Sequence, residues 1–225
     1  MLARSTFDET FFGVPCYRLH QPITDRDLDE LAASGRTAAV FADAKVLADD
    51  LDSARVLLDF GFRKICTQVE LRHGLALPTR TSRPVPIENT LKLSNDQTLR
   101  HASNFEVNRF RLDPLVERNV ADALYAEWIR NSLSGAKRVA HIGENFCTFS
   151  DANVTRSIDL LSVLEKRRGF ARCMLEAVLR DARESGLSVV RVVTETENTG
   201  ALAVYRRVGF EIDHFMNVFH LYRAK

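Results

Sequence analysis

The chain has 225 residues, of which 45% are hydrophobic and 27% are charged, and this composition is that of a globular protein with one large domain or two small ones. Its 31 Lys and Arg residues balance its 30 Asp and Glu residues, and a formal net charge of +1 excludes a strongly basic surface for nucleic acid or anionic membranes. No stretch approaches the roughly 20 apolar residues that a membrane-spanning helix needs.

The four cysteines do not form the pattern of a metal site or of a disulfide framework. They are widely separated, and none belongs to a C-x-x-C pair: Cys16, Cys66, Cys147 and Cys173. Such spacing argues against a structural zinc ion and against the bridges of a small secreted protein. Acidic residues near the N-terminus also stand where a secretory signal carries its apolar core. We therefore expect a cytoplasmic protein with reduced cysteines and no metal.

A proline-rich segment at 76–89 predicts the boundary between two domains. It holds three of the six prolines, Pro78, Pro84 and Pro86, and its polar residues have neither helical nor strand periodicity. Proline fixes φ and removes a backbone donor, so such a stretch favours an extended connector. We expect a small α/β domain at 1–75 and a larger domain at 90–225.

The first domain is predicted to alternate short strands and helices. The spacing of its apolar residues predicts strands at 13–19, 37–41 and 65–71, and helices at 24–33 and 53–60. Gly61 follows the second helix and tolerates the left-handed backbone of a helix end. A domain of this size buries a modest core, so we expect it to lean on its neighbour.

The second domain is predicted to contain a parallel strand–helix–strand unit. It opens with a strand at 90–93, a helix at 97–106 and an amphipathic helix from Val116 that closes before Gly135. The remaining elements are strands at 139–142, 146–149, 155–164 and 187–194, helices at 169–184 and 198–208, and closing strands at 211–215 and 218–222. Apolar strands joined by a helix favour a parallel crossover.

The turn between the strand at 155–164 and the following helix has the properties of a phosphate-binding loop. It carries three basic residues and two small or absent side chains along the run Lys166, Arg167, Arg168, Gly169, Phe170 and Ala171. The first N–H groups of a helix have no internal partners, and the helix dipole adds positive charge there. The alternative is a solvated basic turn that ends in a glycine. Taken alone, the pattern is compatible with both interpretations.

This turn and a later helix together resemble the Gcn5-related N-acetyltransferases (GNAT). The family's acetyl-CoA loop has the form Gln/Arg-x-x-Gly-x-Gly/Ala, and here lysine stands in the first position, at Lys166. The segment from Asn198 to Phe210 is similar to the family helix that carries an asparagine, a tyrosine and a terminal Gly-Phe. The resemblance spans about Thr90 to the C-terminus. It implies a mixed, splayed central sheet with flanking helices, and acetyl-CoA as the co-substrate.

The resemblance also implies residue roles. Acetyl-CoA would contact the run 166–171, the asparagine at Asn198, and backbone groups at Leu161, Ser162 and Val163. Tyr205 would protonate the departing thiolate, or else simply pack the helix. A general base is not assigned, although three strand residues are candidates: His141, Glu144 and Asp159.

An internal similarity relates the two domains. The segment 53–62 lies 148 positions before 201–210, and both consist of a helix, Gly-Phe and a strand. Leu57 takes the place of Tyr205, and no phosphate loop precedes it. The first domain is therefore either a degenerate GNAT-like half without the chemistry, or a chance match of two common units.

A narrower resemblance suggests the acceptor. The segments 11–13, 57–62, 125–135, 198–202 and 221–223 are similar to bacterial TDP-fucosamine N-acetyltransferases. This implies that the acceptor is the amino group of a TDP-linked 4-amino-4,6-dideoxy sugar.

Four residues are candidates for contacts with that acceptor. Arg109 and Arg111 have the guanidinium geometry that matches a pyrophosphate, or else they pair with Asp113. Tyr125 and Asn131 lie along one side of a helix and face either a sugar or the core.

Two alternative functions remain open from the sequence. One is acetylation of another primary amine, such as a peptide N-terminus, a lysine or a small metabolite. The other is a non-catalytic module that binds CoA. The sequence does not fix the oligomeric state, for which a homodimer is one option.

Overall fold

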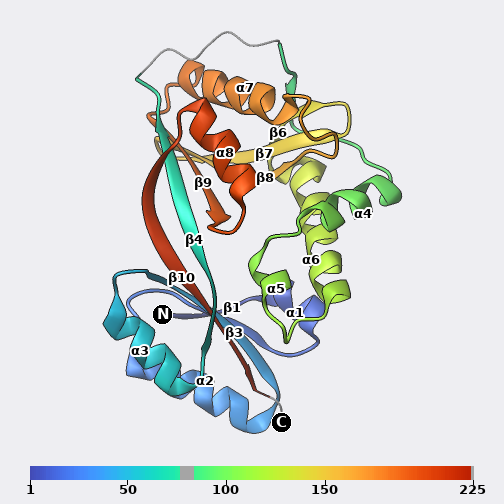
Figure 1. The fold of residues 1–225 in the computed structure, drawn as a ribbon. Coiled ribbons are helices and arrows are strands. Elements are labelled where there is room, and N and C mark those ends of the chain that lie inside the picture. The colour runs from blue at the N-terminus through green and yellow to red at the C-terminus, as the bar shows by residue number, and fades with distance from the viewer. Residues whose placement is uncertain (77–83, 224–225) are drawn as a thin grey trace. The chain divides into compact units, whose positions relative to one another are not determined.

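A computed structural model describes residues 1–76 and 84–223 (Figure 1). Contacts between residues divide the chain into two units, which we describe separately. Unit 1 contains residues 1–68, 108–124 and the end of the chain from residue 214, and unit 2 contains 69–107 and 125–213. This division differs from the sequential cut at 76–89 that the prolines suggest, and Pro78 lies outside the described residues.

Unit 1 is a sheet with helices packed against it. Its elements are β1 (Leu2–Arg4), α1 (Thr6–Phe12), β2 (Cys16–Leu19), α2 (Asp25–Thr37), β3 (Val40–Leu47), α3 (Leu51–Phe60) and α5 (Arg109–Leu112), with parts of β4 (Arg63–Gly74) and β10 (Glu211–Arg223). The strand order is β1-β2-β3-β10-β4, and β2 and β3 are parallel. Apolar residues of α2 and α3, among them Leu31 and Leu57, are fully buried against these strands.

Side chains and glycine fix the ends of the helices in unit 1. At the start of α2, Thr24 and Asp27 form a capping box, in which each side chain bonds the backbone N–H of the other. At the end of α3, Gly61 has a φ of +107° and donates its N–H to Leu57 O and Leu58 O. The prediction of a glycine-terminated helix is confirmed.

Unit 2 is an α/β layer in which the parallel crossover is confirmed. Its elements are β5 (Ile87–Glu88), α4 (Asn95–Asn104), β6 (Arg138–Ile142), β7 (Asn145–Ala152), β8 (Thr155–Ser162), α7 (Phe170–Glu184), β9 (Val189–Glu195) and α8 (Thr199–Val208). The strands follow the order β4-β9-β8-β7-β6-β5, with β8 and β9 parallel. Helix α7 lies across β6 to β9, with α8 beside it (Figure 1). Helix α6 (Arg118–Asn131) ends in unit 2, in a π-helical turn at Ser132–Ala136.

Two local predictions are corrected by the structure, which also contains two short helices, α1 and α5, that the sequence does not predict. No strand forms at 90–93. The strand that pairs with β6 is instead β5 at Ile87–Glu88, which lies within the predicted connector. The two closing strands are one continuous strand, β10. The polar Asn217 does not interrupt it, because its side chain accepts a hydrogen bond from Thr67 Oγ1 at 3.1 Å.

Within residues 1–76 and 84–223, no helix is both long enough and apolar enough to cross a membrane.

Candidate functional site

The parallel strands β8 and β9 separate before they end. Their ladder pairs Thr155 with Val189 and closes at Ile158 with Val192, although β8 continues to Ser162 and β9 to Glu195. The cause is a bulge in β8 where it faces β7. Phe149 lies opposite Ile158 and Thr148 opposite Leu160, so Asp159 is an extra residue. A bulge bends its strand and ends regular pairing. A gap therefore opens between β8 and β9 in unit 2.

Two backbone N–H groups at the end of β8, those of Leu161 and Val163, face this gap. The N–H of Leu160 donates to Thr148 Oγ1 at 3.1 Å, and that of Leu164 to Asn145 Oδ1 at 2.9 Å, so both point toward β7. Successive N–H groups of an extended chain point to opposite sides. The N–H groups of Leu161 and Val163 thus face the side of β9, where no ladder uses them.

The side chain of Ser162, the residue between Leu161 and Val163, contacts α4. Its hydroxyl lies 2.8 Å from His101 Nδ1 and accepts a hydrogen bond from Asn104 Nδ2 at 3.3 Å. The side chain thus points to α4 and not into the gap. The sequence reading singled out neither His101 nor Asn104, because only the folded chain brings α4 to the end of β8.

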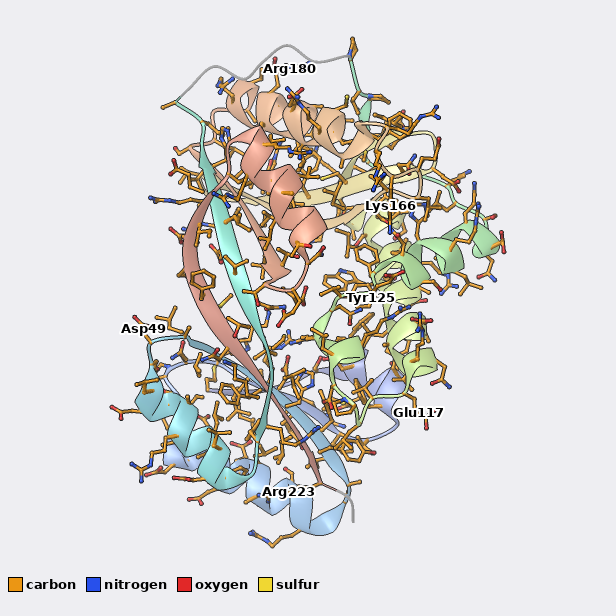
Figure 2. The ribbon with its side chains drawn as sticks, in the orientation of Figure 1. Asp49, Glu117, Tyr125, Lys166, Arg180 and Arg223 are labelled. Atoms are coloured by element: carbon orange, nitrogen blue, oxygen red, sulfur yellow. The ribbon has the colours of Figure 1, made fainter. Side chains whose placement is uncertain are left out.

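The basic turn leads directly from this gap into α7 (Figure 2, Lys166 labelled). Arg167 and Gly169 both have positive φ, at +66° and +77°. Gly169 is the N-cap residue of α7, and no side chain caps the helix. The first bond of the helix is that from Cys173 N to Gly169 O, at 3.0 Å. Among the described residues, the N–H groups of Phe170 and Ala171 have no acceptor, so this helix start is open to an anion.

The charge around the turn is favourable for an anion. The predicted contacts Lys166, Arg167 and Arg168 are exposed, and the first turn of α7 contains no acidic residue. A carboxylate close to the turn is that of Glu165, 4.0 Å from the Arg168 guanidinium. Because exposed pairs of this length are weak, the turn remains electropositive.

Substituting Gly169 with Val is expected to weaken acetyl-CoA binding by about tenfold. A Cβ at this position would meet no protein atom within 4 Å, so the effect comes from a β-branched residue at a φ of +77°. That conformation costs about 1–2 kcal/mol, and the turn must shift to avoid it. Gly186→Val is a matched control, because Gly186 has a φ of +73° and equally open surroundings at the other end of α7. Calorimetry should show weaker acetyl-CoA binding in Gly169→Val alone. Equal acetyl-CoA affinities in the two variants would contradict phosphate binding at this turn.

Tyr205 lies in the apolar core of unit 2. It is 4% exposed and packs edge to face against Phe210, with ring centroids 5.6 Å apart. Burial, with smaller contributions from Cys147 and Glu195, raises the pKa of Tyr205 well above its ordinary value. The hydroxyl therefore keeps its proton at neutral pH. Within the described ranges, this hydroxyl has no hydrogen-bond partner.

Asn198 is the N-cap of α8. Its Oδ1 accepts from Ala201 N at 3.3 Å, and its Nδ2 donates to Thr194 Oγ1 at 3.1 Å. The side chain thus orients the start of α8, and one of its N–H bonds remains for a ligand.

The three candidate bases differ in their surroundings. His141 Nε2 lies 3.6 Å from Glu88, and Glu144 accepts from Arg100 at 3.0 Å. Asp159 lies on the bulge itself, where Lys137 Nζ approaches it at 3.3 Å and Ser150 donates to it at 3.2 Å. Burial raises the pKa of Asp159, against the lowering effect of Lys137. Asp159 is thus the candidate that lies beside the gap.

The arginines proposed for the acceptor already have carboxylate partners. In unit 1, Arg109 forms an ion pair with Asp43, and Arg111 forms one with Asp122. Neither pairs with Asp113, which instead binds Arg63 and His220.

Tyr125 and Asn131 differ in their exposure. Tyr125 is buried, with the rings of Phe105 and Trp128 at 5.0 and 5.5 Å from its own (Figure 2). Asn131 is exposed at the end of α6.

Comparison with known proteins agrees with this geometry. Residues 146–210 match the model of the acetyltransferase (GNAT) family. No curated protein matches the chain by sequence.

Solved structures share the fold across nearly the whole chain. A GCN5-related N-acetyltransferase from Sphaerobacter thermophilus is 12% identical, with a TM-score of 0.62, over 100% of this chain and 76% of that one. A tandem GNAT protein from the clavulanic acid biosynthesis pathway is 15% identical, with a TM-score of 0.58, over 95% and 77%. A glucosamine N-acetyltransferase region of a fungal multi-domain β-N-acetylglucosaminidase is 11% identical, with a TM-score of 0.57, over 92% and 30%. The chain therefore has the GNAT fold, and the part that holds the gap, the basic turn and Tyr205 carries the sequence signature of the GNAT acetyltransferases.

Proposed function

We propose that the chain is an acetyl-CoA-dependent N-acetyltransferase that acts on the amino group of a nucleotide-linked amino-dideoxy sugar. The observation that carries the acetyl-CoA part is the gap between β8 and β9, which opens directly beside the uncapped start of α7. A gap with free N–H groups suits an extended amide-bearing arm, and an uncapped helix start suits a pyrophosphate. The two features follow each other along the chain in the order in which such a molecule would need them.

Acetyl-CoA fits the residues present and supplies an activated acetyl thioester. The N–H groups of Phe170 and Ala171, with the basic side chains at 166–168, would hold its phosphates. The N–H groups of Leu161 and Val163 would hold the arm, and donors of this kind stabilise negative charge that develops on a carbonyl oxygen.

Tyr205 is the proposed proton donor to the departing sulfur. Its raised pKa makes it a weak acid in the free protein. The same burial would also destabilise the CoA thiolate beside Tyr205, because the thiolate and the tyrosine phenolate both lose solvation there. The proton therefore moves between two groups whose charged forms are destabilised together.

Direct transfer between two bound substrates is favoured over an acetylated cysteine. Cys147 is fully buried in β7, and burial raises the pKa of its thiol. A neutral, inaccessible thiol is a poor nucleophile. The acceptor amine would thus attack the thioester itself, without a covalent enzyme intermediate.

A nucleotide-linked amino sugar is the proposed acceptor on the narrower sequence resemblance. The fold is compatible with amino sugars, since a glucosamine N-acetyltransferase region shares it. The test is a thiol-release assay with acetyl-CoA and separate acceptors: TDP-linked and other nucleotide-linked amino sugars, lysine peptides and polyamines. Turnover with a nucleotide sugar is expected to exceed that with the others. Faster turnover with a peptide or a polyamine would show that the acceptor is a different amine. Acetyl-CoA binding without turnover on any acceptor would indicate a non-catalytic CoA-binding module.

Unit 1 repeats the order of elements around the gap but not the features that would hold a cofactor. The run β2-α2-β3-α3-β4 parallels β8-α7-β9-α8-β10. The parallel pairing of β2 and β3 continues to the last residue of β2, Leu19, which lies opposite Ala44. No gap therefore opens between these strands. The start of α2 is filled by Thr24 and the Asp27 carboxylate, which would repel a phosphate. Leu57 occupies the position that corresponds to Tyr205.

We therefore expect one acetyl-CoA per chain. Titration calorimetry with the full chain should give a stoichiometry near one, and Gly169→Val should weaken that single site. A second site of comparable affinity would contradict the interpretation of unit 1 as a degenerate half.

A further inference from the structure

His101 is a buried polar residue that packs against the strand beside the gap. It lies on α4 with no exposed surface, and its ring is 4.9 Å from that of Phe146 on β7. Its Nδ1 lies 2.8 Å from Ser162 Oγ. Its Nε2 is buried and has no partner among the described residues. A buried imidazole nitrogen without a close partner is costly to keep, so the short contact between Nδ1 and Ser162 calls for an explanation.

Asn104, one turn further along α4, completes a connection to the end of β8. Its Nδ2 donates to Ser162 Oγ at 3.3 Å and to the carbonyl of Val163 at 3.3 Å. These bonds fix Ser162 and the peptide after it from the side of α4. The N–H groups of Leu161 and Val163 flank that residue and face β9. A rotation of this stretch would turn both N–H groups away from the gap.

We propose that His101 and Asn104 form a clasp on Ser162 that aims the N–H groups of Leu161 and Val163 into the gap, for the pantetheine arm of acetyl-CoA. Both are positioning residues, since neither needs to touch the ligand. The proposal rests on the proposed function, because it assigns the gap to that arm.

The test separates the arm of the ligand from its phosphates. His101→Phe keeps the ring and removes both nitrogens, and Ser162→Ala removes one oxygen. Each is expected to weaken acetyl-CoA binding by roughly threefold to tenfold, the usual worth of one hydrogen bond. Affinity for ADP, which has a pyrophosphate but no pantetheine, should stay within about twofold of the parent. A clasp with only a general structural role would lower both affinities together.

Coupling and rescue sharpen the result. The double variant should bind acetyl-CoA no more weakly than Ser162→Ala alone, because Ser162→Ala already removes the bond that His101→Phe removes. His101→Asn places a polar atom near the position of Nδ1 and should recover part of the affinity. Amide hydrogen exchange at residues 160–164 should be faster in His101→Phe than in the parent, a readout that needs no ligand.

His73→Phe is the matched control. His73 is a second buried histidine of unit 2 with an unpartnered Nδ1, and it packs against Phe210, with ring centroids 5.4 Å apart. The same substitution there should leave exchange at 160–164 unchanged.

The outcomes distinguish the two proposals. If the parent binds acetyl-CoA and both clasp variants bind it equally well, the clasp is wrong and the proposed function stands. Equal losses for acetyl-CoA and ADP also overturn the clasp. A parent that binds no acetyl-CoA overturns both. If His101→Phe does not fold, Ser162→Ala decides the matter.

Discussion

Replacing Tyr205 with Phe is expected to lower kcat for acetyl transfer by about 10²–10⁴-fold, the usual contribution of a general acid. Acetyl-CoA affinity should stay within about twofold, because only a hydroxyl is removed and the ring stays against Phe210. The loss should fall on kcat more than on KM, since the proton is needed only as the thiolate forms. Steady-state kinetics and calorimetry on the same preparation measure both.

The controls for this variant are a second tyrosine and the pH profile. Tyr17→Phe removes a hydroxyl that bonds Ser34 at 3.1 Å in unit 1, and it should leave turnover unchanged. Because burial raises the pKa of Tyr205, its ionisation should not lower activity on the alkaline side up to about pH 10. Near-normal turnover in a folded Tyr205→Phe protein would remove the acid role, and water would become the next candidate.

The Arg156→Ala variant is expected to lose about 3–5 kcal/mol of unfolding free energy, as when one partner of a buried ion pair is removed. Arg156 has no exposed surface and donates to Asp151 at 2.7 and 2.8 Å and to Val178 O at 2.9 Å. It also lies 2.7 Å from Asp181, and its guanidinium is 4.3 Å from the Phe149 ring centroid. Its removal leaves the Val178 carbonyl without its donor and takes one partner from each of the two carboxylates, of which Asp181 keeps Arg138. Urea unfolding followed by circular dichroism measures the loss.

Arg138→Ala is the matched control for Arg156. Arg138 pairs with the same Asp181 at 2.8 Å, but its side chain is 39% exposed. An exposed pair contributes about 0–1 kcal/mol, so this variant should be nearly as stable as the parent. Equal losses of unfolding free energy in Arg156→Ala and Arg138→Ala would show that burial does not determine how much Arg156 contributes to stability.

The segment that carries the proposed chemistry could be predicted because its signals are local. An apolar run, a basic turn with Gly169, and an amphipathic helix follow one another within about 30 residues, as in a crossover unit. Gly61 and Gly209 likewise mark helix ends through their own backbone freedom. Such features need no information from elsewhere in the chain.

Features that depend on distant partners could not be predicted in the same way. The bulge at Asp159 exists only because β7 pairs with β8 in a shifted register. The clasp needs α4 to lie against the end of β8, some 60 residues later in the sequence. The sequence therefore does not indicate that the Ser162 side chain faces α4. It offers Asp113 as a local partner for Arg109 and Arg111, and nothing local indicates Asp43 as the partner of Arg109.

The starts of α2 and α7 differ in whether the chain itself satisfies the first N–H groups of the helix. In α2 the chain supplies its own anion, Asp27, and the first turn is satisfied at all times. In α7 the corresponding place holds no side-chain acceptor, because the N-cap residue is Gly169. Its φ of +77° would strain a residue such as Ser or Thr that could otherwise cap the helix. The backbone conformation that leaves the start of α7 open therefore also resists its closure by a single substitution, whereas α2 is closed by its own side chains.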